Sequence, residues 1–343
     1  MDAQDQDLVT DGRFNFGRFE RPFRRINPLD ARIVERFSLP RAVKAFRLKE
    51  WQAFQMANDR FFLNVALFNA KALALVQVKV FDRLTRTKHL FEKKVTPWAF
   101  TGPEQLFDSE MAWRGKDAVV VFRNQLARDR IRVHLDVPAS DHAPRLYGDI
   151  VARSLGQTPL VVAIPFGDNH GMTSHKGLMP ADGELQIGDT TTTFGPGNGY
   201  VLMDDHRGFY PFVMKWDWLT SATWRPDGTL IGFNLTHNQS IDPERFHENA
   251  LWINGRIHTL PPVTFERRGK GTDERWRITD RHGRVDLTFA VEVPGAVDIN
   301  AVVIRSKYKG PFGTISGALV DDDGQRHAVD DWFGMGEDFY LRC

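Results

Sequence analysis

The sequence predicts an all-β protein built as two β-barrel-like or sandwich-like halves. Short runs of apolar and aromatic residues recur along the chain, roughly one every 8–12 residues, with polar residues between them. Turn sequences with the required glycine separate several of these runs. Helical patterns are few and are confined to residues 28–38 and 103–112. Because so many strands exceed one comfortable sheet, two halves are predicted.

Strand-like runs begin at Lys44 and continue almost to the end of the chain. In RIRVHLDV, charged or polar residues alternate with apolar ones, which is typical of a strand with one polar-lined face. The other runs before residue 155 are WQAFQMAND, RFFLNVALFN, ALALVQVKVFDR, LFEKKVTPW, DAVVVFRN and LYGDIVARS. Later runs include LVVAIPF, GELQIGDTTTTF, GYVLMDD, TLIGFNLTHN, ALWINGRIHTL, RWRITD, VDLTFAVEV, AVVIRSKYK and GTISGALVDD.

The division between the halves is predicted near the glycine-rich segment GPGNG, residues 195–199. This segment is not expected to bind phosphate, because its spacing is wrong and a strand-like run follows it instead of a helix. We therefore expect an irregular N-terminal segment over residues 1–30, a first domain over residues 31–194 and a second domain over residues 195–343.

The N-terminal segment interleaves arginine with phenylalanine in the run RFNFGRFERPFRR. Such a run has two interpretations, a nucleic-acid-binding arm or a segment whose phenylalanines lie on the domain surface. In the second case the arginine stems cover apolar surface while their charged ends stay in water. The near-neutral charge of the whole chain favours the second interpretation.

Composition excludes several classes of protein. The chain has 343 residues, with 45 Lys plus Arg against 44 Asp plus Glu, so no global field attracts nucleic acid or an anionic membrane. Its one cysteine, Cys343, leaves no internal disulfide. The acidic N-terminal residues do not form a signal peptide, and no apolar run approaches the length of an integral membrane segment. We expect a cytoplasmic location.

The stretch Tyr200–Trp224 concentrates charged side chains among aromatic rings. Charged groups in such surroundings have perturbed proton affinities, and the rings could line a pocket for a large apolar ligand. The charged residues are Asp204, Asp205, His206, Arg207, Lys215 and Asp217, and the rings are Tyr200, Phe209, Tyr210, Phe212, Trp216, Trp218 and Trp224.

Several motifs in a fixed order resemble a known family. The motifs are SHKGLMPADGEL, DDHRGFYP, KWDW, IGFNLTHN, ENALWINGRIHTLPPVTFE and FGMGEDF. In this order, over roughly residues 40–340, they resemble a bacterial domain-of-unknown-function family, DUF2804. That family is similar to the tandem-lipocalin superfamily of AttH and the carotenoid 1,2-hydratases.

The resemblance implies two lipocalin-like β domains in tandem and an apolar ligand site. Relatives of this kind act on isoprenoid or polyketide chains without a metal or an organic cofactor, so we expect no cofactor. The resemblance also implies a histidine after the Glu-Asp pair of the last motif. This chain has Phe339 there, after Glu337 and Asp338, so a histidine role at this place is missing or relocated.

Asp217 is one candidate proton donor, because it lies between two tryptophans. A protonated carboxyl in apolar surroundings could add a proton to a carbon–carbon double bond, and aromatic faces would stabilise the resulting cation. Strand alternation, however, puts Trp216 and Trp218 on one face and Asp217 on the other. Asp217 would then pair with Lys215 or Arg225 on a wet face.

Asp205, His206 and His175 are the other proton-transfer candidates. A carboxylate beside an imidazole could activate water, although Asp205 and His206 could equally form a charged turn before Gly208. The neighbouring His175 and Lys176 could bind a carboxylate or enolate oxygen, or they could cap a loop end.

Other polar and aromatic residues are predicted to bind substrate. Trp216, Trp218, Trp224 and Trp252 form the candidate pocket wall. Asn234 would face the ligand or bond a neighbouring loop, because an amide inside a strand needs a partner. The predicted binding residues are completed by Lys176, Arg207 and His237. For Glu248, Asn249, Glu337 and Asp338 we favour a buried Glu-to-Arg pair that joins the ends of the chain.

No metal is predicted. Asp168, His170 and His175 offer nitrogen and oxygen ligands, as do His134 and Asp136 on one strand face, but no HExxH or paired-cysteine signature is present. The sequence also lacks a Gly-x-Ser-x-Gly elbow for nucleophilic acyl chemistry.

These features together favour a cofactor-independent hydratase or cyclase. It would add water, with acid assistance, to a carbon–carbon double bond of a small hydrophobic molecule, isoprenoid- or lipid-like. One alternative is a carrier protein for the same ligand class, since lipocalin-type barrels hold apolar ligands by shape alone. A second alternative is a carbohydrate-active or carbohydrate-binding protein, in which tryptophan platforms and carboxylates contact sugar rings.

Overall fold

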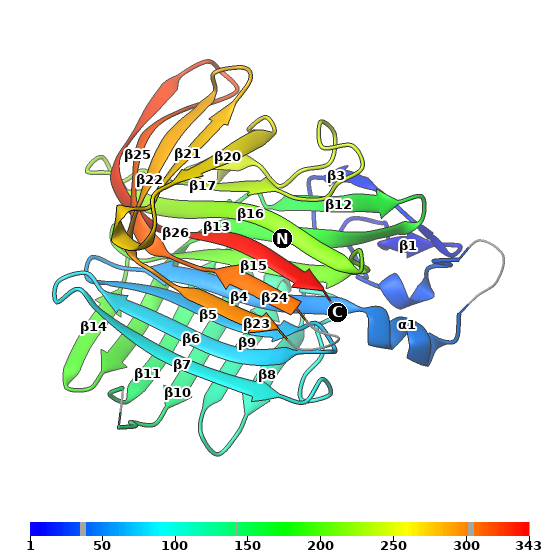
Figure 1. Ribbon diagram of the computed structural model, residues 1–343, viewed down its shortest axis with the longest axis horizontal. Helices are drawn as coiled ribbons and strands as arrows, with labels where there is room; N and C mark the ends of the chain where they lie inside the picture. Colours follow the sequence, from blue (N-terminus) through cyan, green and yellow to red (C-terminus); the bar gives the residue numbers. More distant parts are fainter. Residues whose placement is uncertain (35–38, 142, 301–304, 343) are drawn as a thin grey trace. The chain divides into compact units, whose positions relative to one another are not determined.

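The computed structural model describes residues 1–34, 39–141, 143–300 and 305–342, and it confirms the all-β prediction (Figure 1). The strands are β1 (Val9–Thr10), β2 (Arg13–Phe14), β3 (Gly17–Phe19), β4 (Lys49–Ala57), β5 (Phe61–Asn69), β6 (Ala74–Asp82), β7 (Thr87–Val95), β8 (Ser109–Arg114), β9 (Val119–Gln125), β10 (Arg130–Val137), β11 (Leu146–Arg153), β12 (Leu160–Gly167), β13 (His170–Ile187), β14 (Thr190–Phe194), β15 (Tyr200–Gly208), β16 (Val213–Trp224), β17 (Leu230–His237), β18 (Ala250–Ile253), β19 (Arg256–Thr259), β20 (Val263–Arg268), β21 (Arg275–Asp280), β22 (Val285–Val293), β23 (Ala296–Asn300), β24 (Arg305–Lys309), β25 (Phe312–Val320) and β26 (Arg326–Arg342). The helical elements are η1 (Pro28–Asp30), α1 (Arg41–Arg47), η2 (Leu126–Arg128) and η3 (Gly271–Asp273).

The chain forms two compact units. The first contains Met1–Ala163 and Gly167–Phe209, and the second contains Ile164–Phe166 and Tyr210–Cys343. Strand β15 belongs to the first unit, because it pairs with β4 on one side and β13 on the other. The main boundary between the units follows Phe209, and the short segment Ile164–Phe166 of β12 also belongs to the second unit. The predicted boundary after residue 194 lies before β15.

The sheet of the first unit has 13 strands and curls on itself. Its main path runs β7-β6-β5-β4-β15-β13-β11-β10-β9-β8, with β3, β12 and β14 paired beside it. Strands β4 and β9 are far apart in this order, yet the rings of Phe54 and Phe122 have centroids 4.6 Å apart. Gln52 Nε2 also donates to Asn124 Oδ1 at 3.3 Å. The concave face is therefore closed over a core of its own.

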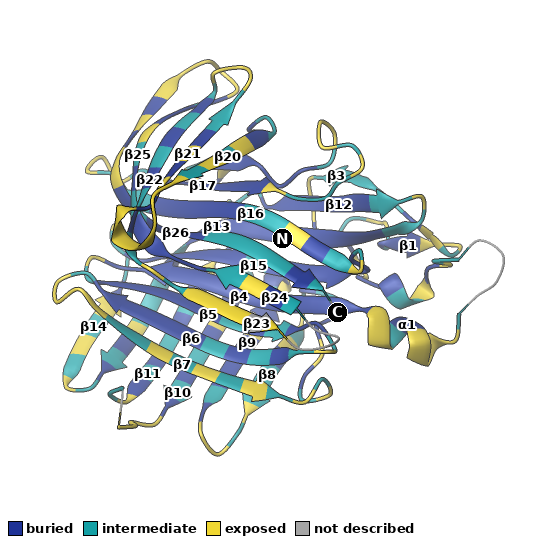
Figure 2. Cartoon of the chain, in the orientation of Figure 1, coloured by how far each residue is buried: buried dark blue, intermediate teal, exposed yellow. Residues whose placement is uncertain are grey.

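This core is lined by every second residue of the strands, as period-two alternation requires. On β10, for example, Ile131, Val133 and Leu135 are fully buried while Arg132 is exposed. The burial colouring shows the same alternation on the neighbouring strands (Figure 2). The apolar residues thus form the core that holds the strands together, and the polar residues between them cover the convex face.

The sheet of the second unit has 11 strands and also curls. Its main path runs β19-β18-β17-β16-β26-β25-β22-β21-β20, with β23 and β24 paired beside β26. Strands β16 and β20 are separated in this order, but Asp217 and Arg267 form an ion pair across the concave face at 2.7 Å. The core of this unit includes Trp276, Phe289 and Phe233, all fully buried.

The N-terminal segment lies on the first unit as the second interpretation predicted. Phe14 and Phe23 are buried in the core, and β3 pairs with β12. The arginines project outward, with the Arg24 side chain 62% exposed in an ion pair with Asp7. Phenylalanine rings supply the contacts of this segment, and no nucleic-acid role is needed to explain its composition.

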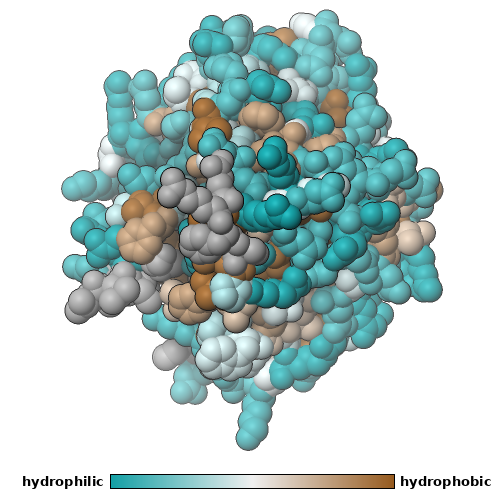
Figure 3. Space-filling model, turned by 90° about the vertical axis from the view of Figure 1, so that its right-hand side faces the viewer, coloured by the Kyte–Doolittle hydropathy of each residue, from teal (hydrophilic) through white to brown (hydrophobic). Residues whose placement is uncertain are grey.

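Helices are few, as predicted, but one expected position is wrong. Residues 109–112 belong to β8, which pairs with β9 and buries Met111. The expected helix over residues 28–38 contains η1, and residues 35–38 lie outside the described part. In the described part of the chain, no helix has the length and apolar character needed to cross a membrane. The face drawn in Figure 3 is mostly hydrophilic, with apolar residues in small groups.

Two glycines allow long strands to bend. Gly183 on β13 has a φ of +142°, and Gly317 on β25 has a φ of +137°. A Cβ at Gly183 would overlap the carbonyl oxygen of Asp149 on β11, and one at Gly317 would overlap that of Asp286 on β22. Both sites therefore require glycine for conformation and for space.

We expect Gly183→Ala to lower the apparent free energy of unfolding by about 3 kcal/mol, because strain and overlap add. Gly197→Ala is the matched control: its φ is +85°, but a Cβ there meets nothing within 4 Å. The control substitution should lower the free energy of unfolding by only about 1 kcal/mol. Urea denaturation measures both, and equal losses would contradict the role given to Gly183.

Candidate functional site

Three neighbouring strands, β4, β15 and β13, place the polar residues of the first unit. Their antiparallel register sets Asp204 opposite Lys176, Asp205 opposite His175 and His206 opposite Ser174. Successive residues of a strand point to opposite faces of a sheet. The run Asp-Asp-His is therefore divided between two surfaces.

Odd-numbered and even-numbered residues of β15 lie on opposite faces, and this identifies the two surfaces. Val201 and Met203 belong to the core of the first unit, so Asp205 and its partner His175 face that core. Asp204 and His206 lie on the other face of the same strand. The interpretation that the Asp205 carboxylate acts on the His206 imidazole is therefore corrected, because alternation separates residues that are adjacent in sequence.

His206 is the centre of a compact polar group on the face away from the core. Its Nε2 lies 2.7 Å from Asp204 Oδ1, 3.2 Å from Ser174 Oγ and 3.2 Å from Lys176 Nζ. The ammonium group of Lys176 also forms an ion pair with Asp204 Oδ1. One carboxylate thus serves two basic groups.

An aromatic surface adjoins this group. The Trp51 ring stacks on the His206 ring with centroids 4.5 Å apart and an interplanar angle of 14°, and Phe68 packs against Trp51 at 5.4 Å. Ser174, Lys176, His206 and Trp51 are all buried. We call Ser174, Lys176, Asp204, His206 and Trp51 the His206 cluster. A fixed imidazole with a carboxylate partner can both take and return a proton.

Asp205 and His175 form a different environment on the core side. Burial raises the pKa of Asp205 to about 7, although a hydrogen bond with Gln52 opposes the shift. Burial lowers the pKa of His175 to about 4. At neutral pH the imidazole is uncharged and the carboxyl is only partly ionised, so burial reduces the charge that this pair carries in an apolar interior.

Arg207 shares the core-side face but is held by structural partners. Its Nη1 donates to the carbonyl oxygens of Ile26 at 3.0 Å and Pro103 at 3.2 Å, and its Nε lies 3.2 Å from Glu50 Oε2. Glu50 also pairs with Lys71 at 2.6 Å. These contacts tie the N-terminal segment and the loop at Pro103 to the sheet.

In the second unit, the tryptophans share the face of β16 that points away from the core. Leu219 is a core residue, so Trp216, Trp218 and Trp224 lie on the opposite face, as alternation predicted. Trp218 Nε1 donates to Asn234 Oδ1 at 2.6 Å. Asn234 Nδ2 in turn donates to the Glu248 carbonyl at 2.6 Å, and Trp252 is fully buried on neighbouring β18.

Glu337 has two aromatic side chains as hydrogen-bond donors. Its carboxylate accepts from Trp216 Nε1 at 2.9 Å and from the Tyr308 hydroxyl at 2.9 Å. Asp338 approaches Arg267 at 3.9 Å. Phe339 stacks on Trp216 with centroids 3.8 Å apart, so the ring that stands where a histidine was expected packs against the tryptophan.

Asp217 lies on the core side of β16 and is an ion-pair partner. Arg267 Nη2 donates to its Oδ1 at 2.7 Å, and His237 Nδ1 lies 3.5 Å from its Oδ2. Burial alone would raise the pKa of Asp217, but His237 and Arg267 lower it on balance. The partner is therefore Arg267, not Lys215 or Arg225, and a carboxylate of lowered pKa is a poor proton donor at neutral pH.

The four predicted proton-transfer residues therefore do not form one group. His206 joins Lys176 on one face, Asp205 joins His175 on the other, and Asp217 belongs to the second unit. Three members of the His206 cluster, Ser174, Asp204 and Trp51, were not among the predicted catalytic or binding residues, although Asp204 was one of the charged residues noted in Tyr200–Trp224. The Asp-x-His spacing was the available signal for Asp204, because residues two apart share a strand face.

The structure groups possible metal ligands elsewhere than the sequence did. Among the described residues, His258, Asp321 and Asp323 have ligand atoms within 4.8 Å of one another. Asp321 already pairs with His327 at 2.8 Å and accepts from the backbone N–H groups of Asp323 and Gln325. These bonds give Asp321 a structural role in its turn.

Comparison with known proteins gives a family and a fold. The family model of DUF2804, a domain of unknown function, matches residues 2–342. No curated protein matches the sequence. A solved structure of CghA with Sch210972 has a TM-score of 0.56 and 14% identity, over 98% of this chain and 97% of that chain.

Two further solved structures are similar. A putative AttH from Nitrosomonas europaea has a TM-score of 0.50 and 13% identity, over 91% of this chain and 99% of that chain. Kievitone hydratase from Nectria haematococca has a TM-score of 0.47 and 10% identity, over 86% of this chain and 88% of that chain. The similarity to AttH agrees with the predicted lipocalin-like halves, and at such identities it concerns the fold.

The raised pKa of Asp205 and the lowered pKa of His175 predict how the stability of the fold depends on pH. Between pH 4 and 7 folded Asp205 keeps a proton that the unfolded chain has released, so its contribution to the free energy of unfolding falls as pH rises. Between pH 4 and 6.5 His175 is protonated in the unfolded chain but not in the folded chain. The contribution of His175 to the free energy of unfolding therefore rises with pH.

The variant Asp205→Asn should therefore gain stability relative to wild type as pH rises from 4 to 7, by up to about 1.4 kcal/mol per pH unit. The variant His175→Gln should gain stability relative to wild type as pH falls from 6.5 to 4. Urea denaturation at pH 4.5, 5.5 and 6.5 measures both differences. Differences that stay flat with pH would contradict the buried positions of these groups.

Proposed function

This chain is a member of the DUF2804 family, and we propose that it is a cofactor-independent enzyme of the hydratase or cyclase type. Its substrate is a hydrophobic isoprenoid- or lipid-like molecule with a carbon–carbon double bond. The observation that carries the proposal is the His206 cluster, in which a base, its carboxylate partner, an ammonium group and an aromatic surface occupy one sheet face.

His206 is the proposed acid–base residue. The contact of 2.7 Å with Asp204 fixes one ring nitrogen and stabilises the imidazolium that forms when the ring takes a proton. The stacked Trp51 ring restricts rotation of the imidazole. Such an arrangement supports repeated proton transfer at a fixed position, which adding water to a double bond requires.

The reaction that these groups support best is water addition to a double bond conjugated with a carbonyl group. His206 takes a proton from water while the water oxygen bonds to the β-carbon, and Lys176 stabilises the enolate oxygen that develops. His206 then returns the proton to the α-carbon, so one molecule of water is added overall. In a cyclase, a hydroxyl group of the substrate takes the place of water.

The surroundings of the cluster favour an apolar substrate. Trp51 and Phe68 present neighbouring rings, and the charges of Lys176 and Asp204 are paired with each other. Paired charges next to aromatic surface are compatible with a hydrocarbon chain that carries one polar group. A carrier protein would use the same surface, but it would not need the His206–Asp204 pair.

The neighbouring carboxyls Asp204 and Asp205 provide a matched test. Asp204→Asn should lower turnover by roughly 10²–10⁴-fold, because the imidazole loses its carboxylate partner. Asp205→Asn makes the same chemical change on the opposite face and should retain turnover. His206→Gln should lose activity as Asp204→Asn does.

The assay follows incorporation of ¹⁸O from labelled water into enones that carry prenyl or acyl chains, detected by mass spectrometry. Tryptophan fluorescence titration with the same enones measures binding. Binding without incorporation by wild-type protein would favour the carrier alternative. Equal losses in Asp204→Asn and Asp205→Asn, with both variants folded, would contradict the assignment of His206 and Asp204.

A further inference from the structure

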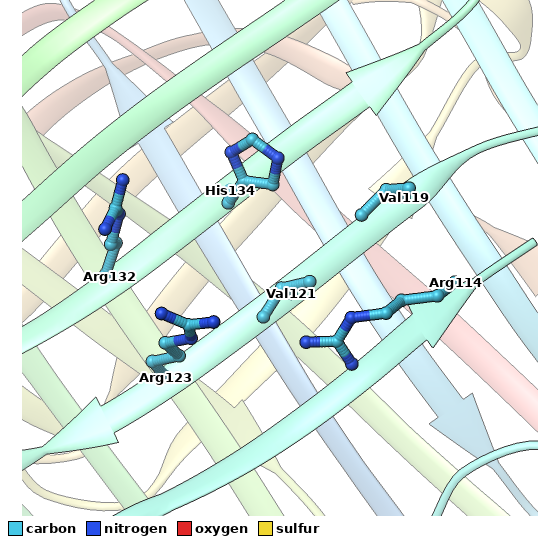
Figure 4. A pocket seen from close by; sticks show the side chains of 6 residues that line it. All are labelled: Arg114, Val119, Val121, Arg123, Arg132 and His134. Atoms are coloured by element: carbon cyan, nitrogen blue, oxygen red, sulfur yellow. The ribbon is translucent and has the colours of Figure 1, made fainter.

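A basic hollow lies on the outer face of the first unit, away from the strands that carry the His206 cluster. It has a volume of about 300 Å³ and is formed on strands β8, β9 and β10 (Figure 4). Its lining consists of Arg114, Val119, Val121, Arg123, Arg132 and His134. The hollow therefore combines three guanidinium groups and an imidazole with a small apolar floor.

Strand alternation explains why these residues gather. On β9, Val120 and Phe122 enter the core, so Val121 and Arg123 face outward. The guanidinium groups of Arg114 and Arg123 point toward each other on either side of Val121 (Figure 4). The long arginine side chains form the walls, and the short valines leave the space between them.

Positive charge exceeds negative charge among the side chains of the hollow. Arg123 and Arg132 are direct register partners on neighbouring strands, and like charges opposite each other destabilise a sheet. Two carboxylates lie nearby. Glu110 pairs with Arg114 at 2.6 Å and with Arg123 at 3.0 Å, and Asp149 pairs with Arg132. Three guanidinium groups thus share two carboxylates, although the whole chain is nearly neutral.

Each arginine also keeps donors that the protein does not use. Arg114 donates through Nη2, Arg123 through Nε, and Arg132 through Nε and Nη2. Among the described residues, no acceptor is bound to Nη1 of any of the three or to Nη2 of Arg123. The side chains are about half exposed, at 51%, 52% and 45% respectively. These donors are open to a ligand in the hollow.

We propose that this hollow binds the phosphate monoester group of a small organic molecule. Phosphate offers three terminal oxygens that can accept from guanidinium groups on different sides, whereas one arginine fork satisfies a carboxylate. The apolar floor of Val119 and Val121 would contact the carbon part of the ligand. A volume of about 300 Å³ is at the lower end of the range for small-molecule sites.

The proposal is independent of the reaction assigned to the His206 cluster, because the two groups of residues occupy different strands. Phenyl phosphate is the probe, titrated into the full-length protein by isothermal titration calorimetry at low ionic strength. We expect saturable binding with a Kd of about 1 mM or below. Inorganic phosphate should bind more weakly, since it lacks contact with the valines, and phenol should not bind.

Two variants test the arginines separately. Arg123→Gln and Arg132→Gln should each weaken phenyl phosphate binding by about tenfold, because each removes a charged donor from the hollow. Arg153→Gln is the matched control, since Arg153 is an outward-facing arginine, 54% exposed, that pairs with Asp182 on the same sheet. It should bind like wild type. Circular dichroism checks that each variant is folded.

Wild-type protein that shows no saturation, or binds phenol as well as phenyl phosphate, would overturn the proposal. An equal loss in Arg153→Gln and Arg123→Gln would also overturn it, because the effect would then come from general surface charge. Retention of binding in both Arg123→Gln and Arg132→Gln would place the anion elsewhere. Loss confined to these two variants is the result that the hollow predicts.

Discussion

Strands β4 and β15 and the first half of β13 are buried on both faces, so each polar side chain along them needs a partner within the folded chain. Burying an unpaired charge costs several kcal/mol, which the fold can offset only by pairing and hydrogen bonding. Arg207 illustrates the constraint. It binds Glu50 and two backbone carbonyls, and through them it fixes Ile26 and Pro103 against the sheet. One buried guanidinium group thus contributes to the order of the N-terminal segment, together with its phenylalanine rings.

The same two-sided burial gives neighbouring carboxyls different chemical states. Asp204 faces the Lys176 ammonium group and the His206 ring, whereas Asp205 faces the core, where burial raises its pKa to about 7. Pairs of titratable groups in contrasting environments are characteristic of acid–base sites. In this chain the contrast arises from a single residue step along β15, and the proposed proton-transfer role belongs to the His206 face.

In each unit, the alternation of side chains along a strand also decides which residues share a surface. In the second unit Trp216 and Trp218 occupy one face of β16, while Asp217 pairs with Arg267 on the other. On the convex side of the first unit, parity leaves arginines beside short valines on strands β8, β9 and β10, which makes the basic hollow. The function of each surface therefore depends on which residues share a face, more than on which are adjacent in sequence.

Period-two alternation is a local property, and the sequence alone determined what depends on it. The strand class and the separation of Asp217 from its flanking tryptophans follow from patterns within about ten residues. The two halves follow from the number of such runs, and the family from the order of its motifs along the chain. The spacing of Asp204 and His206 carried the same information. Adjacency in the sequence instead suggested Asp205 as a possible partner of the His206 imidazole, with a charged turn as the alternative.

Only the tertiary structure decided the pairings between distant strands. The register of β13 with β15 brings Lys176 to Asp204, and the pairing of β4 with β15 puts Trp51 over His206. Asp217 meets Arg267, 50 residues away, because the second sheet curls. Register and curvature are set by the packing of whole sheets, in which a shift of one residue would turn every side chain to the other face. Local sequence therefore specifies each strand and its two faces, and long-range packing specifies the partner of each face.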